Sequence, residues 1–160
     1  MTEPNALLAA ARELRSTIDA NAAKAGSEPV PVETVQALQQ AGLFGAMAPR
    51  ELGGAELPLL GAIDVFAEVA RADGSAGWCL MAGASAVAYF GAYGGDEFTE
   101  TLFADGVPLV AGQFAPNGQG RPVEGGYRLT GSYQFGSGLS YAEWVGAGFL
   151  VPAQIGRAHV

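Results

Sequence analysis

The chain has 160 residues, of which 49% are apolar and 15% charged, a composition typical of a globular protein rather than a disordered one. Its 16 acidic and 8 basic residues give a net charge of −8, which argues against nucleic-acid binding because a phosphate backbone needs a concentrated positive surface. Cys79 is the only cysteine and His159 the only histidine, so neither a disulfide nor a zinc site is expected. Without a signal peptide pattern at the N-terminus, we expect a cytoplasmic protein.

The first 106 residues carry the apolar spacing of helices. Helices are predicted over residues 5–25, 31–42, 58–72, 76–93 and 96–104. The first carries one apolar stripe, formed by Leu7, Ala11, Leu14 and Ile18. In the second, Val32, Val35 and Leu38 are expected to face inward. In the third, the spacing places Ile63, Phe66, Ala67 and Ala70 on the buried side and Asp64, Glu68 and Arg71 on the solvent side.

The fourth helix has no charged residue in the 18 positions from 76 to 93. A membrane span is disfavoured, because the segment consists mostly of alanine and glycine, which add little insertion free energy. We expect instead the buried centre of a helical bundle, with Asp73 or Ser75 as its N-terminal cap and Asp96 capping the next helix. Trp78, Met81 and Ser85 share one face, where they form either core packing or part of a substrate pocket.

After Gly106 the apolar spacing changes from about 3.6 to about 2 residues, which indicates strands. Strands are expected over residues 107–114, 127–135 and 144–151, with a loop at 116–120. The predicted fold class is therefore α+β. An all-α domain at 1–106 is followed at 107–154 by the first strands of a β-barrel, which we expect to be truncated. Residues 155–160 read IGRAHV, as a sequencing-adapter sequence would in frame, and are expected to be a non-native tail.

Gly136, Ser137 and Gly138 interrupt the alternating pattern directly after Phe135. Two glycines around one hydroxyl allow the backbone to approach a flat ligand closely. The same residues also fit an ordinary glycine-containing bend in a barrel, and spacing alone does not decide between the two.

Three motifs resemble the acyl-CoA dehydrogenase superfamily. The segment GLFGAMAPRELGG at 42–54 is similar to the superfamily pattern GLxxxxxPxxxGG, and GSAGWC at 74–79 is similar to its central helix. The segment GSYQFGSG at 131–138 resembles GxWxFxSG of the flavin-dependent monooxygenases in that superfamily more closely than NGxKxWITNG of the dehydrogenases. Phe135 and Ser137 match the monooxygenase pattern, and Tyr133 replaces its tryptophan.

The resemblance implies a flavin enzyme, in which the cofactor performs the redox step and the protein positions it. It implies cofactor contacts by Gln113, Phe114, Phe135, Gly136 and Ser137, and substrate contacts by Trp78, Met81 and Ser85. FAD is the expected cofactor. The dehydrogenases carry a threonine and a serine in the segment that corresponds to 114–119, and this chain has neither there. FMN or FADH2 supplied by a reductase is therefore the alternative. No catalytic residue is assigned, since the dehydrogenases carry their base in a C-terminal bundle.

The main expectation for function is a fragment of an FAD-linked dehydrogenase acting on an acyl-CoA-like substrate, inactive as the 160-residue chain. One alternative is a reduced-flavin-dependent monooxygenase of the same fold, and a second is a non-catalytic interaction module. The resemblance also implies a small-molecule substrate, a homotetramer in the full-length protein, and an electron-transfer or flavin reductase partner. A membrane or nucleic-acid partner is not expected.

Overall fold

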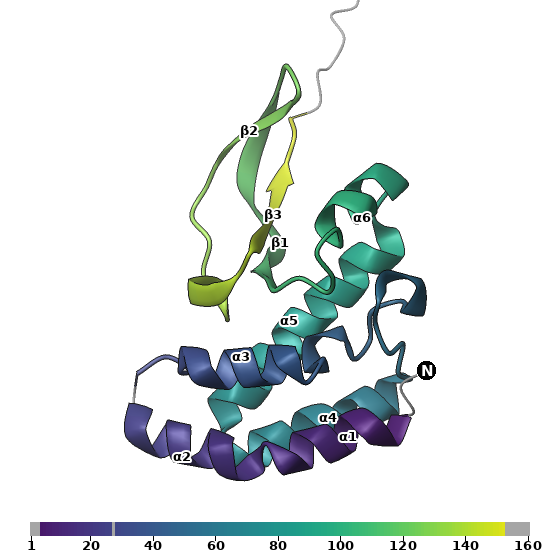
Figure 1. Cartoon of the computed structure of the whole chain (residues 1–160). Coiled ribbons are helices and arrows are strands. Elements are labelled where there is room, and N and C mark those ends of the chain that lie inside the picture. The colour runs from purple at the N-terminus through teal and green to yellow at the C-terminus, as the bar shows by residue number, and fades with distance from the viewer. Residues whose placement is uncertain (1–3, 27, 153–160) are drawn as a thin grey trace, which may run out of the picture.

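Helices and strands occupy separate parts of the chain. The computed structural model describes residues 4–26 and 28–152, and within these ranges it contains six α-helices followed by three β-strands (Figure 1). The helices are α1 (Pro4–Glu13), α2 (Arg15–Ala25), α3 (Val32–Gln40), α4 (Leu59–Ala72), α5 (Gly74–Tyr93) and α6 (Asp96–Leu102). The strands are β1 (Val110–Val123), β2 (Gly126–Thr130) and β3 (Trp144–Leu150), and the short 3-10 turns are η1 (Leu43–Gly45), η2 (Arg50–Leu52) and η3 (Leu139–Tyr141). This arrangement confirms the predicted α+β class, whereas residues 155–160 lie outside the described residues.

The predicted first helix is divided at Leu14 into α1 and α2. Backbone hydrogen bonds still run through the junction, because the Leu14 amide donates to Ala10 and the Ile18 amide donates to Leu14, at 3.1 and 2.9 Å. Leu7, Ala11 and Ile18 are buried, as the apolar spacing predicted.

Helix α3 begins after Pro31 and is followed by Gly42, whose φ of 73° is favourable for glycine and ends the helical path. Val35 and Leu38 are buried. The inward placement predicted for Val32 is wrong: its side chain is 53% exposed, because it occupies the first position of the helix.

The predicted buried face of α4 is rotated relative to the structure. Phe66 is buried as predicted, but Ile63 is exposed, and the fully buried positions are Ala62, Val65 and Val69. Ala70 is exposed as well. The sequence contains two apolar stripes on α4, and only packing against α1, α2 and α5 selects between them.

Glu68 is buried within the helical part, although the sequence pattern placed it in solvent. Its carboxylate accepts hydrogen bonds from Arg15 on α2 and, at 2.7 Å, from Arg71 on α4. Burial acts to raise the pKa of Glu68, but the two arginines outweigh it and hold the pKa below the ordinary value of 4.5. The ion triad therefore joins α2 to α4 while the carboxylate stays ionised.

The Glu68 triad makes the stability of the protein depend on pH. A carboxylate with a lowered pKa stabilises the folded state above its unfolded pKa, and this stabilisation is lost as the pH falls through the folded pKa. We expect Glu68→Gln to be less stable than the wild type at pH 7, with a difference that shrinks below about pH 4.5. Urea unfolding at several pH values measures this. A difference that stays constant down to pH 3 would contradict a charged role for Glu68, and Glu33→Gln on α3 is the control.

Helix α5 has one buried and one exposed face. The Asp73 side chain caps it by accepting a hydrogen bond from the Ser75 amide at 2.9 Å, as predicted. Small residues and Leu80 face the core, whereas Trp78, Tyr89 and Tyr93 are 52–78% exposed. The expectation of burial on all sides is therefore wrong within the described residues, because the aromatic side chains gather on the outer face. No helix in the described ranges is long and apolar enough to cross a membrane.

The N-terminal cap predicted for α6 is also wrong. Gly95, rather than Asp96, is the cap residue. The Thr99 hydroxyl donates to the carbonyl oxygens of Gly95 and Asp96, at 3.2 and 3.0 Å, and so ties the first turn together.

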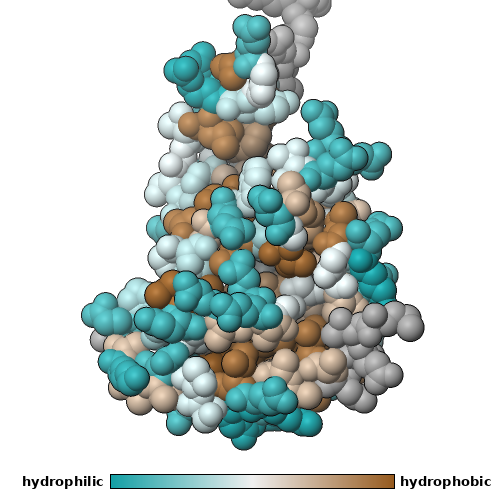
Figure 2. Space-filling view, in the orientation of Figure 1, coloured by the Kyte–Doolittle hydropathy of each residue, from teal (hydrophilic) through white to brown (hydrophobic). Residues whose placement is uncertain are grey.

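The strands form one sheet in the order β2-β1-β3. β1 is antiparallel to β2 and parallel to β3, and residues between Gln113 and Gly118 bulge out of the register with β3. β1 thus passes through the segment predicted as a loop, and β2 ends at Thr130, short of the predicted 135. Apolar surface is exposed over the sheet and where the sheet meets α5 and α6 (Figure 2).

Candidate functional site

The loop that follows β2 contacts the central helix through a side-chain hydrogen bond. The indole Nε1 of Trp78, on α5, donates to the Ser137 hydroxyl at 2.9 Å. The two residues are far apart in the sequence, and Trp78 remains 60% exposed. The structure therefore brings together one predicted substrate residue and one predicted cofactor residue at the junction of helices and sheet.

Phe135 is held in an exposed position by its backbone. Its side chain is 90% exposed and its φ is 57°, a left-handed conformation that is uncommon for a bulky residue. The Ser137 amide donates to the Phe135 carbonyl at 2.8 Å, and the amide of the preceding Gln134 donates to the Gln113 side chain at 2.9 Å. These bonds fix a strained turn that presents the ring to the outside.

Only one of the two glycines in this loop is required by the fold. Gly138 has a φ of 85°, and an added Cβ would come within 3.1 Å of the Tyr141 ring. At Gly136 the nearest atoms to an added Cβ belong to Leu139, at 3.6 Å, which is an ordinary contact. The fold therefore requires glycine at 138, whereas a Cβ at 136 would meet only an ordinary contact with Leu139.

The side chains of Gln113 and Phe114, which are neighbours on β1, contact different parts of the protein. Gln113 supports the loop, whereas the Phe114 ring packs against Tyr89 and Phe90 of α5, with ring centroids 5.1 and 5.7 Å apart. Phe114 also borders a cavity of about 400 Å³ between α5, α6 and the sheet, together with Trp144. Of the five predicted cofactor residues, only Phe114 is separated from the loop.

Met81 and Ser85 continue the Trp78 face of α5. The Ser85 hydroxyl donates to the Met81 sulfur at 3.9 Å, and Met81 packs against the helical core. Both side chains are half-buried. The shared face predicted from spacing is thus present, with Met81 partly engaged in core packing.

Tyr141 and Cys79 border the site, and the sequence reasoning assigned neither a role. With Trp78, they line a cavity of about 470 Å³ between α5, η3 and the 28–30 segment. The Tyr141 hydroxyl is buried and has no hydrogen-bond partner among the described residues. Burial raises the pKa of Tyr141 well above its ordinary value, and the nearby Cys79 adds to the increase, so the phenol stays neutral. No local pattern brings Tyr141 to Cys79, because the two lie on η3 and α5.

Comparisons with known proteins agree with this architecture. Residues 2–105 match the family model described as acyl-CoA dehydrogenase, N-terminal domain. A pigment production hydroxylase from Rhodococcus sp. (strain ATCC 21145) is 37% identical over 118 residues, which cover 70% of this chain and 29% of the hydroxylase. The oxygenase component of an FADH(2)-dependent resorcinol hydroxylase from Rhizobium sp. (strain MTP-10005) is 30% identical over 127 residues, covering 78% of this chain and 31% of its own length.

Among solved structures, the HsaA monooxygenase from M. tuberculosis superposes with a TM-score of 0.84 and 27% identity. The superposition covers 92% of this chain and 41% of the HsaA chain. This chain thus spans about three-tenths of the length of the curated relatives that it matches.

These comparisons correct the main functional expectation. The expected dehydrogenase acting on an acyl-CoA-like substrate is wrong, because the similar proteins are hydroxylases and a monooxygenase. The monooxygenase alternative agrees with them. The shared helical domain and the matched fold nevertheless establish the wider group: the chain belongs to the acyl-CoA dehydrogenase superfamily.

Proposed function

We propose that this chain is the helical and flavin-contacting part of the oxygenase component of a flavin-dependent monooxygenase. A reductase partner would supply the reduced flavin, and the substrate would be a small organic molecule. Residues 1–106 would form the helical domain and residues 107–154 the beginning of the flavin-contacting domain. The hydrogen bond between Trp78 and Ser137 beside the exposed Phe135 carries this proposal. The homotetramer and the cytoplasmic location stay predictions from the sequence.

The residues of the loop fit a flavin ring. Phe135 offers an exposed planar apolar surface, and the absence of a side chain at Gly136 lets the backbone approach the ring. The Ser137 hydroxyl has two acceptor lone pairs and one O–H donor, and the Trp78 indole occupies one of the lone pairs. Its hydroxyl can therefore still accept a hydrogen bond from N5–H of a reduced flavin, or donate one to N5 of an oxidised flavin.

When bound, a reduced flavin supplies two electrons to O2, so that one oxygen atom enters the substrate and the other leaves as water. The chain's own residues position the reactants. Phe135 shields one face of the ring from water, Gln113 keeps the loop in place, and Ser137 orients the N5 edge. Trp78, Met81 and Ser85 would line the substrate side, whereas the role of Phe114 as a cofactor contact stays a prediction.

Titration of the protein with FMN and FAD, in oxidised form and anaerobically in reduced form, tests this proposal. We expect saturable binding of at least one flavin, measured by quenching of tryptophan fluorescence, because Trp78 lies at the site. Binding of no flavin in either state would contradict the proposal and favour the non-catalytic interaction module.

Gly136→Ala is expected to block flavin binding without changing the fold. An added methyl group has only ordinary contacts within the chain, but it would occupy the space that a flavin needs. We expect the flavin affinity to fall about tenfold or more, with an unchanged melting temperature. Gly95→Ala is the control, because an added Cβ there meets no atom within 4 Å and the position is remote from the loop. Unchanged flavin affinity in Gly136→Ala would remove this backbone segment from the site.

A further inference from the structure

Two arginines stand directly opposite each other in the hairpin of β1 and β2. Arg121 pairs with Arg128 in the antiparallel register, so both side chains lie on the same face of the sheet. Both are exposed. Like charges placed directly opposite each other destabilise a sheet, and a bound anion would relieve this repulsion.

No carboxylate in the described part of the chain provides that charge. The ion pairs within residues 4–26 and 28–152 join Glu68 to Arg15 and Arg71, and Glu56 to Arg50. Arg121 and Arg128 are absent from this set. The pair is thus a local positive site in a protein whose net charge is −8.

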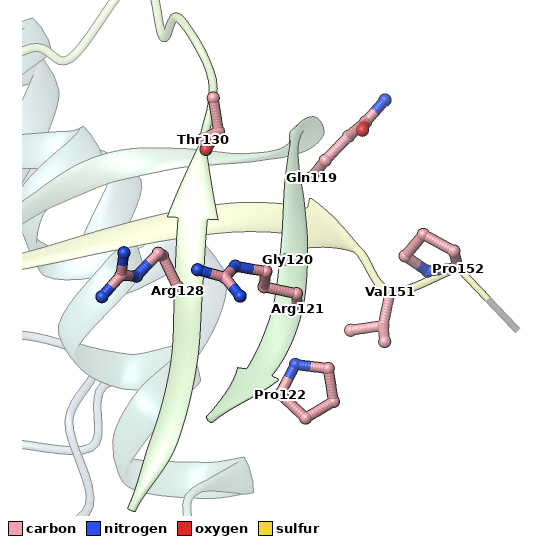
Figure 3. Close-up of a pocket in the computed structure, with 8 residues that line it drawn as sticks. All are labelled: Gln119, Gly120, Arg121, Pro122, Arg128, Thr130, Val151 and Pro152. Carbon is pink, nitrogen blue, oxygen red and sulfur yellow. The ribbon is translucent and has the colours of Figure 1, made fainter. Parts of the chain in front are cut away.

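The two arginines line a cavity of about 750 Å³. Figure 3 shows that their side chains extend in the same direction from β1 and β2. Thr130 shares the Arg128 face of β2 and also lines the cavity, while Pro122, Val151 and Pro152 form an apolar side. This volume lies within the range of small-molecule sites.

We propose that Arg121 and Arg128 bind the phosphoryl group of a small phosphorylated molecule. Each guanidinium presents a planar set of N–H donors, and one guanidinium can bind both oxygen atoms of a carboxylate. Two adjacent guanidinium groups match the several oxygen atoms and the double negative charge of a phosphoryl group. The two arginines lie on the hairpin of β1 and β2, whereas Phe135 and Ser137 lie on the loop that follows β2.

Calorimetric titration of the protein with inorganic phosphate, pyrophosphate and acetate tests the proposal. We expect saturable binding of phosphate, tighter binding of pyrophosphate, and acetate binding weaker than phosphate by about tenfold or more. Arg121→Ala and Arg128→Ala should each reduce phosphate affinity about tenfold or more, because each removes charge-assisted hydrogen bonds. Acetate binding as tight as that of phosphate, or no saturable binding of phosphate and pyrophosphate, would overturn the proposal.

Two further variants separate a built site from general charge attraction. Arg12→Ala removes the same charge from an exposed position on α1, and it should leave phosphate affinity unchanged. Arg128→Lys keeps the charge and removes the guanidinium, and should reduce the affinity while preserving the fold. An equal loss in Arg12→Ala and Arg128→Ala would overturn the proposal, as would full affinity in Arg128→Lys. Either of these results would leave the flavin proposal intact, because Ser137 and Phe135 lie on the loop after β2 and not on the strands that carry the two arginines.

Discussion

Ser137→Ala is expected to weaken flavin binding by about tenfold or more while leaving the fold intact. The Ser137 hydroxyl is a side-chain hydrogen-bonding group two residues from Phe135, and Trp78 already orients its oxygen atom. Losing one such bond, and so leaving its flavin partner atom unpaired, costs about 1–3 kcal/mol, which corresponds to this change in affinity. Titration with oxidised and reduced flavins measures it, and circular dichroism reports on the fold.

Ser140→Ala and Trp78→Phe complete that experiment. Ser140 lies on the neighbouring η3 turn, where it is exposed, and its hydroxyl makes no side-chain hydrogen bond to Trp78 or Ser137 within the described residues, so its loss should change flavin affinity little. Trp78→Phe keeps an aromatic ring but removes the N–H donor that orients Ser137, and we expect a smaller loss than in Ser137→Ala. Wild-type affinity in Ser137→Ala would exclude its hydroxyl from the flavin site.

Two local features of the helical part could be predicted from the sequence, because they depend on neighbouring residues alone. The Gly42 end of α3 and the Asp73 cap of α5 are of this kind. The burial of Glu68 could not be predicted, since it depends on Arg15, which lies on another helix. The same reason explains the rotated face of α4, where two apolar stripes compete and tertiary contacts decide.

In the candidate site, too, features set by neighbouring residues could be predicted and features set by tertiary contacts could not. Phe135 and Ser137 were predicted from a short motif. Its match favoured the pattern of the monooxygenases, and the similar proteins are of that kind, although the main expectation was a dehydrogenase. The motifs at 42–54 and 74–79 do not discriminate between the branches, because both share the helical domain. Three features of the site depend on how the sheet meets α5, which no local pattern encodes. They are the hydrogen bond between Trp78 and Ser137, the left-handed backbone at Phe135, and the packing of Phe114 on α5 away from the loop.

Gly77→Ala is expected to destabilise the protein, although alanine favours helices more than glycine does. Gly77 is buried where α5 passes the end of α4, and an added Cβ would lie 2.5 Å from the Ala70 Cβ and 2.7 Å from its Cα. Because the Cα belongs to the backbone, relief requires the two helices to move apart. Overpacking of this kind costs about 1–3 kcal/mol, and each kcal/mol lowers the melting temperature by about 2–4 °C at this chain length.

Gly74→Ala on the same helix provides the matched control. An added Cβ at Gly74 meets no atom within 4 Å, so only the helix preference of alanine acts there. We expect Gly74→Ala to have an unchanged or slightly higher melting temperature, in contrast to the loss in Gly77→Ala. Equal melting temperatures for the two variants would show that α4 and α5 are not in close contact at Gly77. The position of Trp78 relative to the loop that carries Phe135 and Ser137 would then need revision, since Trp78 is the next residue on α5 and its placement depends on that contact.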